Sequence, residues 1–161
     1  MSEWAEEIER YLASFSPEEV AVSRYAFRAI LAGAPATLTE LPGALSLSPA
    51  AVEAAVRRLT ERGIMAMAPQ PQRIVGVRGL SSVETDHRLT LGGRQLYAWC
   101  AVDGVGIPAA LRADARVESR CHHCGVPLSL ELKGGAVVEA PEGLVIWAAE
   151  RDLSRSLRAY T

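Results

Sequence analysis

Apolar residues recur at helical spacing through roughly the first 65 positions of the chain. One helix is predicted behind Ser2, with an apolar stripe ending at Phe15. A second is predicted from Ser16, which precedes proline and has glutamate three residues on, as in a capping box. A third is predicted between Ser48 and Gly63, because serine followed by proline begins a helix and glycine often ends one. This part of the chain is therefore expected to be helical.

Beyond Gly63 the apolar pattern changes to that of strands. Ile64–Ala68 and Arg73–Arg78 flank a Pro-Gln-Pro-Gln tip, which predicts a β-hairpin. Three helices followed by a hairpin is the order of a winged helix. Residues 1–80 are thus expected to form a three-helix winged-helix-like domain, and the polar stretch Gly79–Asp86 is expected to be a linker.

Residues 81–161 are expected to form a second domain, a small mixed or antiparallel β-sheet with one buried helix. The apolar segment Gln95–Val105 is helix-compatible and would carry Cys100 and Asp103. A short helix is predicted from Pro108, and a last helix over Glu150–Tyr160. The predicted strands are His87–Leu91, Ala115–Arg120, Val126–Leu132, Ala136–Glu139 and Leu144–Ala148. The fold class is therefore α+β.

Charge argues against nucleic acid as the main partner. The chain has a net charge of −2, and residues 1–80 contain eight arginines against nine glutamates. A helix that enters a DNA groove normally lies in a clearly positive field, so the charge favours a scaffold role over nucleic-acid binding. The sequence predicts no membrane span and no secretory signal, which indicates a cytoplasmic protein.

Cys100 and Asp103 are three positions apart in an apolar segment. On a helix this spacing places a thiol beside a carboxyl group. Burial would raise both pKa values and keep the acid able to donate a proton. The alternative is purely structural: a small buried cysteine and a carboxylate that caps the next turn.

Cys121, His122, His123 and Cys124 form a CxxC motif between two predicted strands, followed by glycine. Two thiols at this spacing are half of a tetrahedral metal site, which would need further ligands such as His122, His123, His87, Cys100 or a second subunit. A thiol pair in a turn without metal is the alternative. Three clustered cysteines in a reducing compartment favour metal or thiolate chemistry over disulfides.

The segments Leu96–Asp103, Ile107–Leu111, Ala115–Cys121 and Gly125–Leu130 together resemble the organomercurial (alkylmercury) lyase family. This resemblance implies that Cys100 is the first catalytic cysteine, Asp103 the catalytic aspartate, and Cys121 a cysteine with a structural role. It implies protonolysis of a carbon–mercury bond to hydrocarbon and Hg(II), with no cofactor required. The implied partners are a small organometal substrate and cellular thiols, and the implied role is detoxification.

Two features depart from the family pattern. The family's second catalytic cysteine aligns with Thr161, and Cys124 with its two histidines makes an additional CxxC.

Three hypotheses follow. The first is a lyase in which Cys124 or an external thiol replaces the missing cysteine. The second is a non-catalytic protein that binds Hg, Cu or Zn through a Cys/His cluster comprising Cys100, Cys121, Cys124, His122 and His123, possible as a homodimer. The third is a metal-responsive winged-helix regulator.

Overall fold

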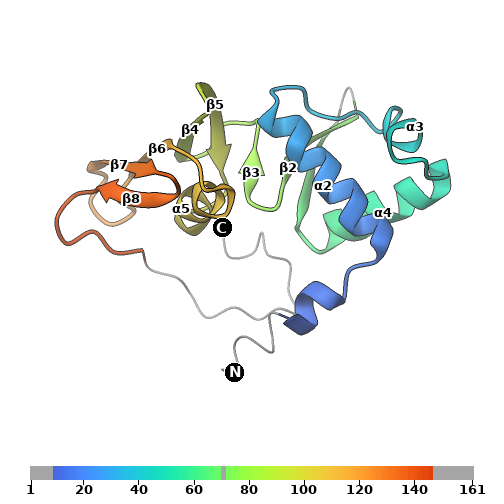
Figure 1. Cartoon of the computed structure of the whole chain (residues 1–161), viewed down its shortest axis with the longest axis horizontal. Helices are drawn as coiled ribbons and strands as arrows, with labels where there is room; N and C mark the ends of the chain where they lie inside the picture. Colours follow the sequence, from blue (N-terminus) through green and yellow to red (C-terminus); the bar gives the residue numbers. More distant parts are fainter. Residues whose placement is uncertain (1–8, 70–71, 147–161) are drawn as a thin grey trace.

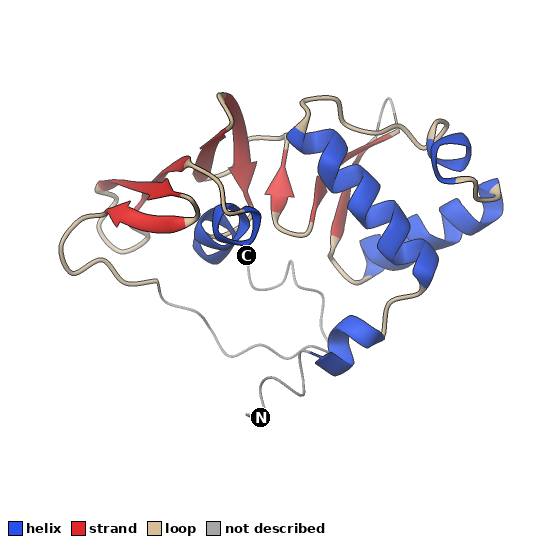
Figure 2. Cartoon of the chain, viewed as in Figure 1, coloured by secondary structure: helices blue, strands red, loops and turns tan. Residues whose placement is uncertain are grey.

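The computed structural model describes residues 9–69 and 72–146, which form a mixed structure of helices and one antiparallel sheet (Figures 1 and 2). Within these residues the sheet has eight strands in the order β1-β2-β3-β5-β4-β6-β7-β8, and all neighbours are antiparallel. The strands are β1 (Met65–Ala68), β2 (Arg73–Val77), β3 (Leu80–Ser81), β4 (His87–Leu91), β5 (Arg94–Ala98), β6 (Ala115–Arg120), β7 (Pro127–Lys133) and β8 (Ala136–Glu139).

The N-terminal helices begin where the sequence predicts. Ser16 caps α2 (Pro17–Leu31) in a capping box with Glu19, and Ser48 caps α4 (Pro49–Glu61) by accepting the N–H of Ala51. Between them lies the short α3 (Leu41–Leu45). Of the predicted first helix, residues 9–13 are helical, and its earlier part lies outside the described residues. None of the helices among the described residues is long and apolar enough to cross a bilayer.

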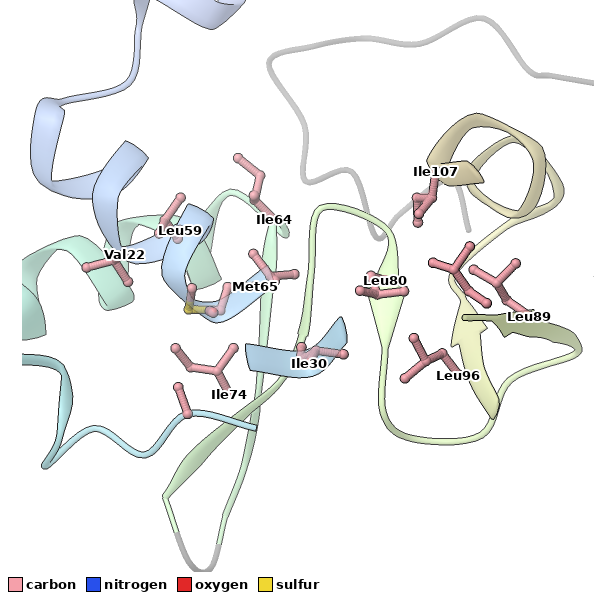
Figure 3. Packing of buried hydrophobic residues seen from close by; sticks show 14 of the residues in the cluster. Val22, Ile30, Leu59, Ile64, Met65, Ile74, Leu80, Leu89, Leu96 and Ile107 are labelled. Carbon is pink, nitrogen blue, oxygen red and sulfur yellow. The ribbon is translucent and has the colours of Figure 1, made fainter. Parts of the chain in front are cut away.

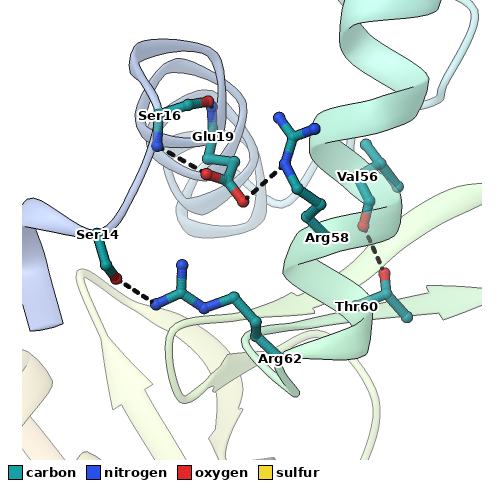
Figure 4. Close-up of polar contacts among 7 residues, drawn as sticks. All are labelled: Ser14, Ser16, Glu19, Val56, Arg58, Thr60 and Arg62. Atoms are coloured by element: carbon teal, nitrogen blue, oxygen red, sulfur yellow. Dashed lines mark hydrogen bonds and ion pairs between the residues drawn. The ribbon is translucent and has the colours of Figure 1, made fainter.

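Charged side chains of α4 are bound within the N-terminal part (Figure 4). Arg58 Nε lies 3.2 Å from Oε1 of Glu19, a carboxylate that is almost fully buried and that also accepts the N–H of Ser16. Arg62 Nη2 donates to Ser14 Oγ at 2.7 Å, and its guanidinium lies 3.8 Å from the ring centroid of Phe15. These contacts join α4 and its C-cap residue Arg62 to the residues that precede and begin α2.

One hydrophobic core joins the N-terminal helices to the C-terminal part of the sheet (Figure 3). In the N-terminal part, Val22 and Ile30 of α2 pack with Leu59 of α4 over β1 and β2. In the C-terminal part, Ile107 of α5 (Ala101–Leu111) packs over β4, β5 and β6. Leu80 of β3 is fully buried and belongs to the same cluster.

The segment predicted to be a linker contains a strand. Residues 80–81 form β3, which pairs with β2 on one side and with β5 on the other. The short strand was missed because two residues show no periodicity, and only their partners make them part of the sheet. The division into domains 1–80 and 81–161 stays a prediction.

The predicted helix Gln95–Val105 is wrong over its first half. Arg94–Ala98 is strand β5, and the helix begins only at Ala101 and continues through Pro108 to Leu111. Leu96 and Ala98 are buried on one sheet face, and a short apolar run cannot be distinguished from helix by periodicity alone. Residues 144–146 are not in a strand, whereas 147–148 and the predicted helix at 150–160 lie outside the described residues.

Candidate functional site

Cys100 lies at the junction between β5 and α5. It has an extended backbone (φ −146°) and is the N-cap of the helix, with its sulfur accepting the N–H of Asp103 at 3.4 Å. Its Sγ also lies 3.0 Å from Asp103 Oδ2, so the thiol donates to the carboxylate. The predicted proximity of the two side chains is confirmed. Cys100 is a helix cap, however, and not a residue within the helix.

The surroundings of Cys100 keep its sulfur protonated at neutral pH. Burial raises the pKa of the Cys100 thiol, and the hydrogen bond to Asp103 raises it further. The backbone N–H groups of Val102 and Asp103 act in the opposite direction, because donors at a helix N-terminus stabilise a thiolate. The site thus holds one proton between a sulfur and a carboxylate, beside backbone donors that favour an anion.

Gly79 presses against the carboxyl group of Asp103. It has φ +83°, and a Cβ built there would overlap the Asp103 side chain. Its carbonyl accepts the N–H of Trp99 at 2.8 Å, which fixes the chain one residue before Cys100. Sequence reasoning missed Gly79 because it lay in a segment expected to be a linker. The available signal was a glycine directly after a strand, a place where backbone conformation or close approach often requires one.

A row of side chains leads across the sheet from this site. Ala98 of β5 pairs with His87 of β4, and His87 Nδ1 lies 2.8 Å from Ser119 Oγ of β6. Burial lowers the pKa of His87, while the nearby carboxylates of Asp86 and Asp103 act against it. His87 is therefore neutral at neutral pH and hydrogen-bonded to Ser119. The sequence had named His87 only as a candidate metal ligand.

Comparisons with known proteins identify the family of this chain. A family model described as MerB, alkylmercury lyase, matches residues 80–161, just over half of the chain. A solved structure, the mercury-bound form of MerB2, is 31% identical with a TM-score of 0.87, and the alignment covers 93% of this chain and 73% of that one. The chain belongs to the alkylmercury lyase family.

Curated family members match about half of the chain. Alkylmercury lyases from Bacillus cereus and Pseudomonas putida are each 37% identical to this family member, over 87 and 86 residues. These alignments cover 53% of this chain, but only 39% and 40% of the two relatives. The chain thus spans well under two thirds of the length of the curated alkylmercury lyases that it matches.

The CxxC motif of this alkylmercury lyase family member forms a tight turn between β6 and β7. The N–H of Cys121 donates to the carbonyl of Val126 at 2.9 Å, and the N–H of Gly125 donates to the carbonyl of Cys121 at 2.8 Å. Gly125 has φ +72°, a conformation that glycine adopts at little cost. All three cysteines are free thiols, and Cys124 is exposed.

The predicted metal cluster is not assembled by the described residues. Across 9–69 and 72–146, no group of three or more His, Cys, Asp or Glu side chains lies close enough to hold a metal ion. His122 and His123 are both exposed in the turn, and His87 is bound to Ser119. A closed zinc site needs four ligands, so the turn offers two sulfurs and not a complete tetrahedral site.

Proposed function

We propose that this chain cleaves the carbon–mercury bond of organomercurials by protonolysis, with Cys100 binding the metal and Asp103 supplying the proton. Membership of the alkylmercury lyase family supports the reaction class. The observation that carries the proposal is the 3.0 Å contact between the Cys100 sulfur and the Asp103 carboxylate at the start of α5. A protein that only bound metal would have no use for this acid.

The hydrogen bond suggests how the proton moves. When the Cys100 sulfur attacks the mercury of R–Hg–X, the thiol proton passes to the Asp103 carboxylate, and the group X leaves as an anion. Asp103 is then a carboxylic acid next to the metal-bound carbon. It gives the proton to that carbon, the carbon–mercury bond breaks, and R–H leaves while Hg(II) stays on sulfur. Proton donors act efficiently when held within hydrogen-bonding distance of the reacting atom, and thiolates are suitable ligands for soft metals.

A second thiolate is expected to increase the electron density on mercury before the bond breaks. The resemblance places the family's second catalytic cysteine at Thr161, which lies outside the described residues. We propose that a cellular thiol such as glutathione takes this role, with Cys124 as the alternative within the chain. No cofactor is needed in this scheme, because the proton comes from Cys100 and the metal is part of the substrate.

The test is release of benzene from phenylmercury in the presence of excess thiol. We expect benzene from the unmodified protein and none above the protein-free background from Cys100→Ala or Asp103→Ala. Asp114→Ala is a suitable control, since Asp114 is an exposed carboxylate that binds the turn at Gly134 and Lys133. Absence of benzene from the unmodified protein would rule out the proposal.

We further propose that the N-terminal part is a winged-helix-like scaffold and not a DNA-binding unit. The order α2, α3, α4 and the β1–β2 hairpin supports the first statement. The use of Arg58 and Arg62 in contacts with Glu19 and Ser14 supports the second (Figure 4). A cytoplasmic location fits a reaction that depends on cellular thiols.

A further inference from the structure

We infer that Cys121 and Cys124 form a dithiol that accepts Hg(II) from Cys100 after the carbon–mercury bond has been cleaved. The source of the metal in this inference rests on the proposed function. Binding of Hg(II) by the two thiols does not, and it is measurable without any cleavage.

The turn brings the two cysteines close together on an accessible surface. Its backbone is closed by the N–H of Gly125, which donates to the carbonyl of Cys121 at 2.8 Å, and by the N–H of Cys121, which donates to the carbonyl of Val126 at 2.9 Å. The backbone N–H groups of Cys124 and His123, and then the Cys124 thiol, lower the pKa of Cys121 because they favour its thiolate. Cys124 is exposed, so a metal ion can reach the pair from solvent. The thiolate is the form of cysteine that binds metal.

The sheet places this dithiol near Cys100 and on the same face. Gly104 of α5 lies against Val117 and Ala98, so α5 covers the face of the sheet to which these residues point. Side chains alternate along a strand, and Val117, Ser119 and Cys121 are successive alternate residues. The ladder continues to Cys121 through its bond to Val126, so Cys121 follows Ser119 on that face.

Only one strand separates the two thiol sites. Cys100 follows β5, Cys121 follows β6, and β4 lies between them with His87 at this end. Neighbouring strands are about 4.8 Å apart, so the two strand ends are separated by roughly 10 Å. A mercury ion released from Cys100 therefore reaches the pair Cys121 and Cys124 after a short path along one face of the sheet.

The number of sulfurs favours mercury over zinc. Hg(II) is soft and forms stable linear complexes with two thiolates, whereas a structural zinc ion requires four ligands. The turn supplies two sulfurs, and the described residues contain no cluster of three or more suitable side chains. Two thiols in one turn also have a high effective concentration, which lets them compete with single thiols in solution.

The transfer is a thiolate exchange without change of oxidation state. After cleavage, Hg(II) is bound in the active site to the Cys100 sulfur and to one external thiolate. Cys121 and Cys124 replace these ligands in turn, and each loses its proton. The two protons go to the displaced Cys100 thiolate and external thiolate, so two mercury–sulfur bonds form and two break.

Loading of a Cys100→Ser variant with HgCl2 tests the binding. The reduced protein is treated with mercury and a few-fold excess of glutathione, desalted, and analysed for mercury per chain. We expect about one mercury ion per chain, and loss of nearly all of it in Cys100→Ser/Cys124→Ser. Cys124 is the better position to change because it is exposed, and circular dichroism checks that the fold is kept.

Matched variants decide whether the sulfurs or the imidazoles of the turn bind the mercury. Cys100→Ser with His122→Ala and His123→Ala removes both imidazoles from the same turn and should retain the mercury. Loss of mercury in this variant, retention in the Cys124→Ser variant, or displacement by equimolar zinc would each overturn the dithiol assignment. After turnover of phenylmercury by the unmodified protein, peptide mapping should find mercury on 121–124. Mercury on Cys100 alone would overturn the transfer, while absence of benzene would refute only the proposed cleavage.

Discussion

The Cys100 sulfur lies 3.0 Å from Asp103 Oδ2 and accepts the backbone N–H of the same aspartate at 3.4 Å. The two contacts give Asp103 two opposite effects on one sulfur. Its carboxylate holds the thiol proton, and its backbone helps to stabilise the thiolate that remains when that proton leaves. In the proposed reaction, this arrangement lets a proton move from sulfur to oxygen when mercury binds.

Asp103→Asn should stop cleavage while leaving binding of mercury to Cys100 intact. The amide cannot take up and return the proton, and a positioned general acid contributes about 10²–10⁴-fold to a rate. Benzene release should fall by at least ~100-fold, and mass spectrometry should still detect a phenylmercury adduct on Cys100. Asp114→Asn is the control and should keep the rate. An Asp103→Asn variant as fast as the unmodified protein would exclude Asp103 as the proton donor.

Gly79→Ala should reduce cleavage activity by more than its effect on the stability of the fold explains. The new Cβ would overlap the Asp103 carboxyl group, and φ +83° is unfavourable for alanine by about 1–2 kcal/mol. Gly92→Ala is the matched control, because Gly92 also has positive φ (+56°) but nothing lies near its missing Cβ. Urea unfolding should show comparable backbone penalties, and only Gly79→Ala should lose benzene release. Equal activity in both variants would show that contact with Gly79 does not position Asp103.

Cys121 and Cys100 should react with iodoacetamide in an order set by their surroundings. The pKa of Cys121 is lowered by backbone donors, whereas the pKa of Cys100 is raised by burial and Asp103. A lowered pKa means more thiolate at pH 7, so Cys121 should be labelled before Cys100. Labelling of Cys100 should increase as the pH rises above the usual pKa range of a thiol, and Asp103→Asn should shift this increase to lower pH. Peptide mass spectrometry follows the labelling of each cysteine. Faster labelling of Cys100 than of Cys121 at pH 7 would contradict the pKa directions given for the two thiols.

Arg58→Ala should destabilise the protein without changing the chemistry. Its removal deprives the buried Glu19 carboxylate of its charged partner, while the N–H of Ser16 still donates to that carboxylate. Hydrogen bonds to charged groups contribute about 1.5–3 kcal/mol, and the partial exposure of Arg58 favours the lower end. Arg57→Ala, at an exposed position of the same helix, should cost less. Urea unfolding measures the difference, and equal stability of the two variants would contradict it.

Much of the chain's local structure could be predicted from sequence. Ser16 and Ser48 begin helices because a side-chain oxygen and a following proline act within a few residues, and at Ser16 two glutamates in the first turn add to this signal. The strand bounds His87–Leu91, Ala115–Arg120 and Ala136–Glu139 were also predicted correctly, since alternation and flanking turns are local signals. The spacing of Cys100 and Asp103 was sufficient to place a thiol beside a carboxylate.

Long-range pairing was decided only by the tertiary structure. Residues 94–98 form a strand because β3 and β4 lie on either side of them, and residues 80–81 form one because β2 and β5 do. Contact of Gly79 with Asp103, and of His87 with Ser119, joins segments 24 and 32 residues apart. Sequence alone determined which residues are candidates for the proposed chemistry, since residue type and local spacing define those candidates. Their protonation and their neighbours depend on burial and strand order, which arise only when distant segments pack together.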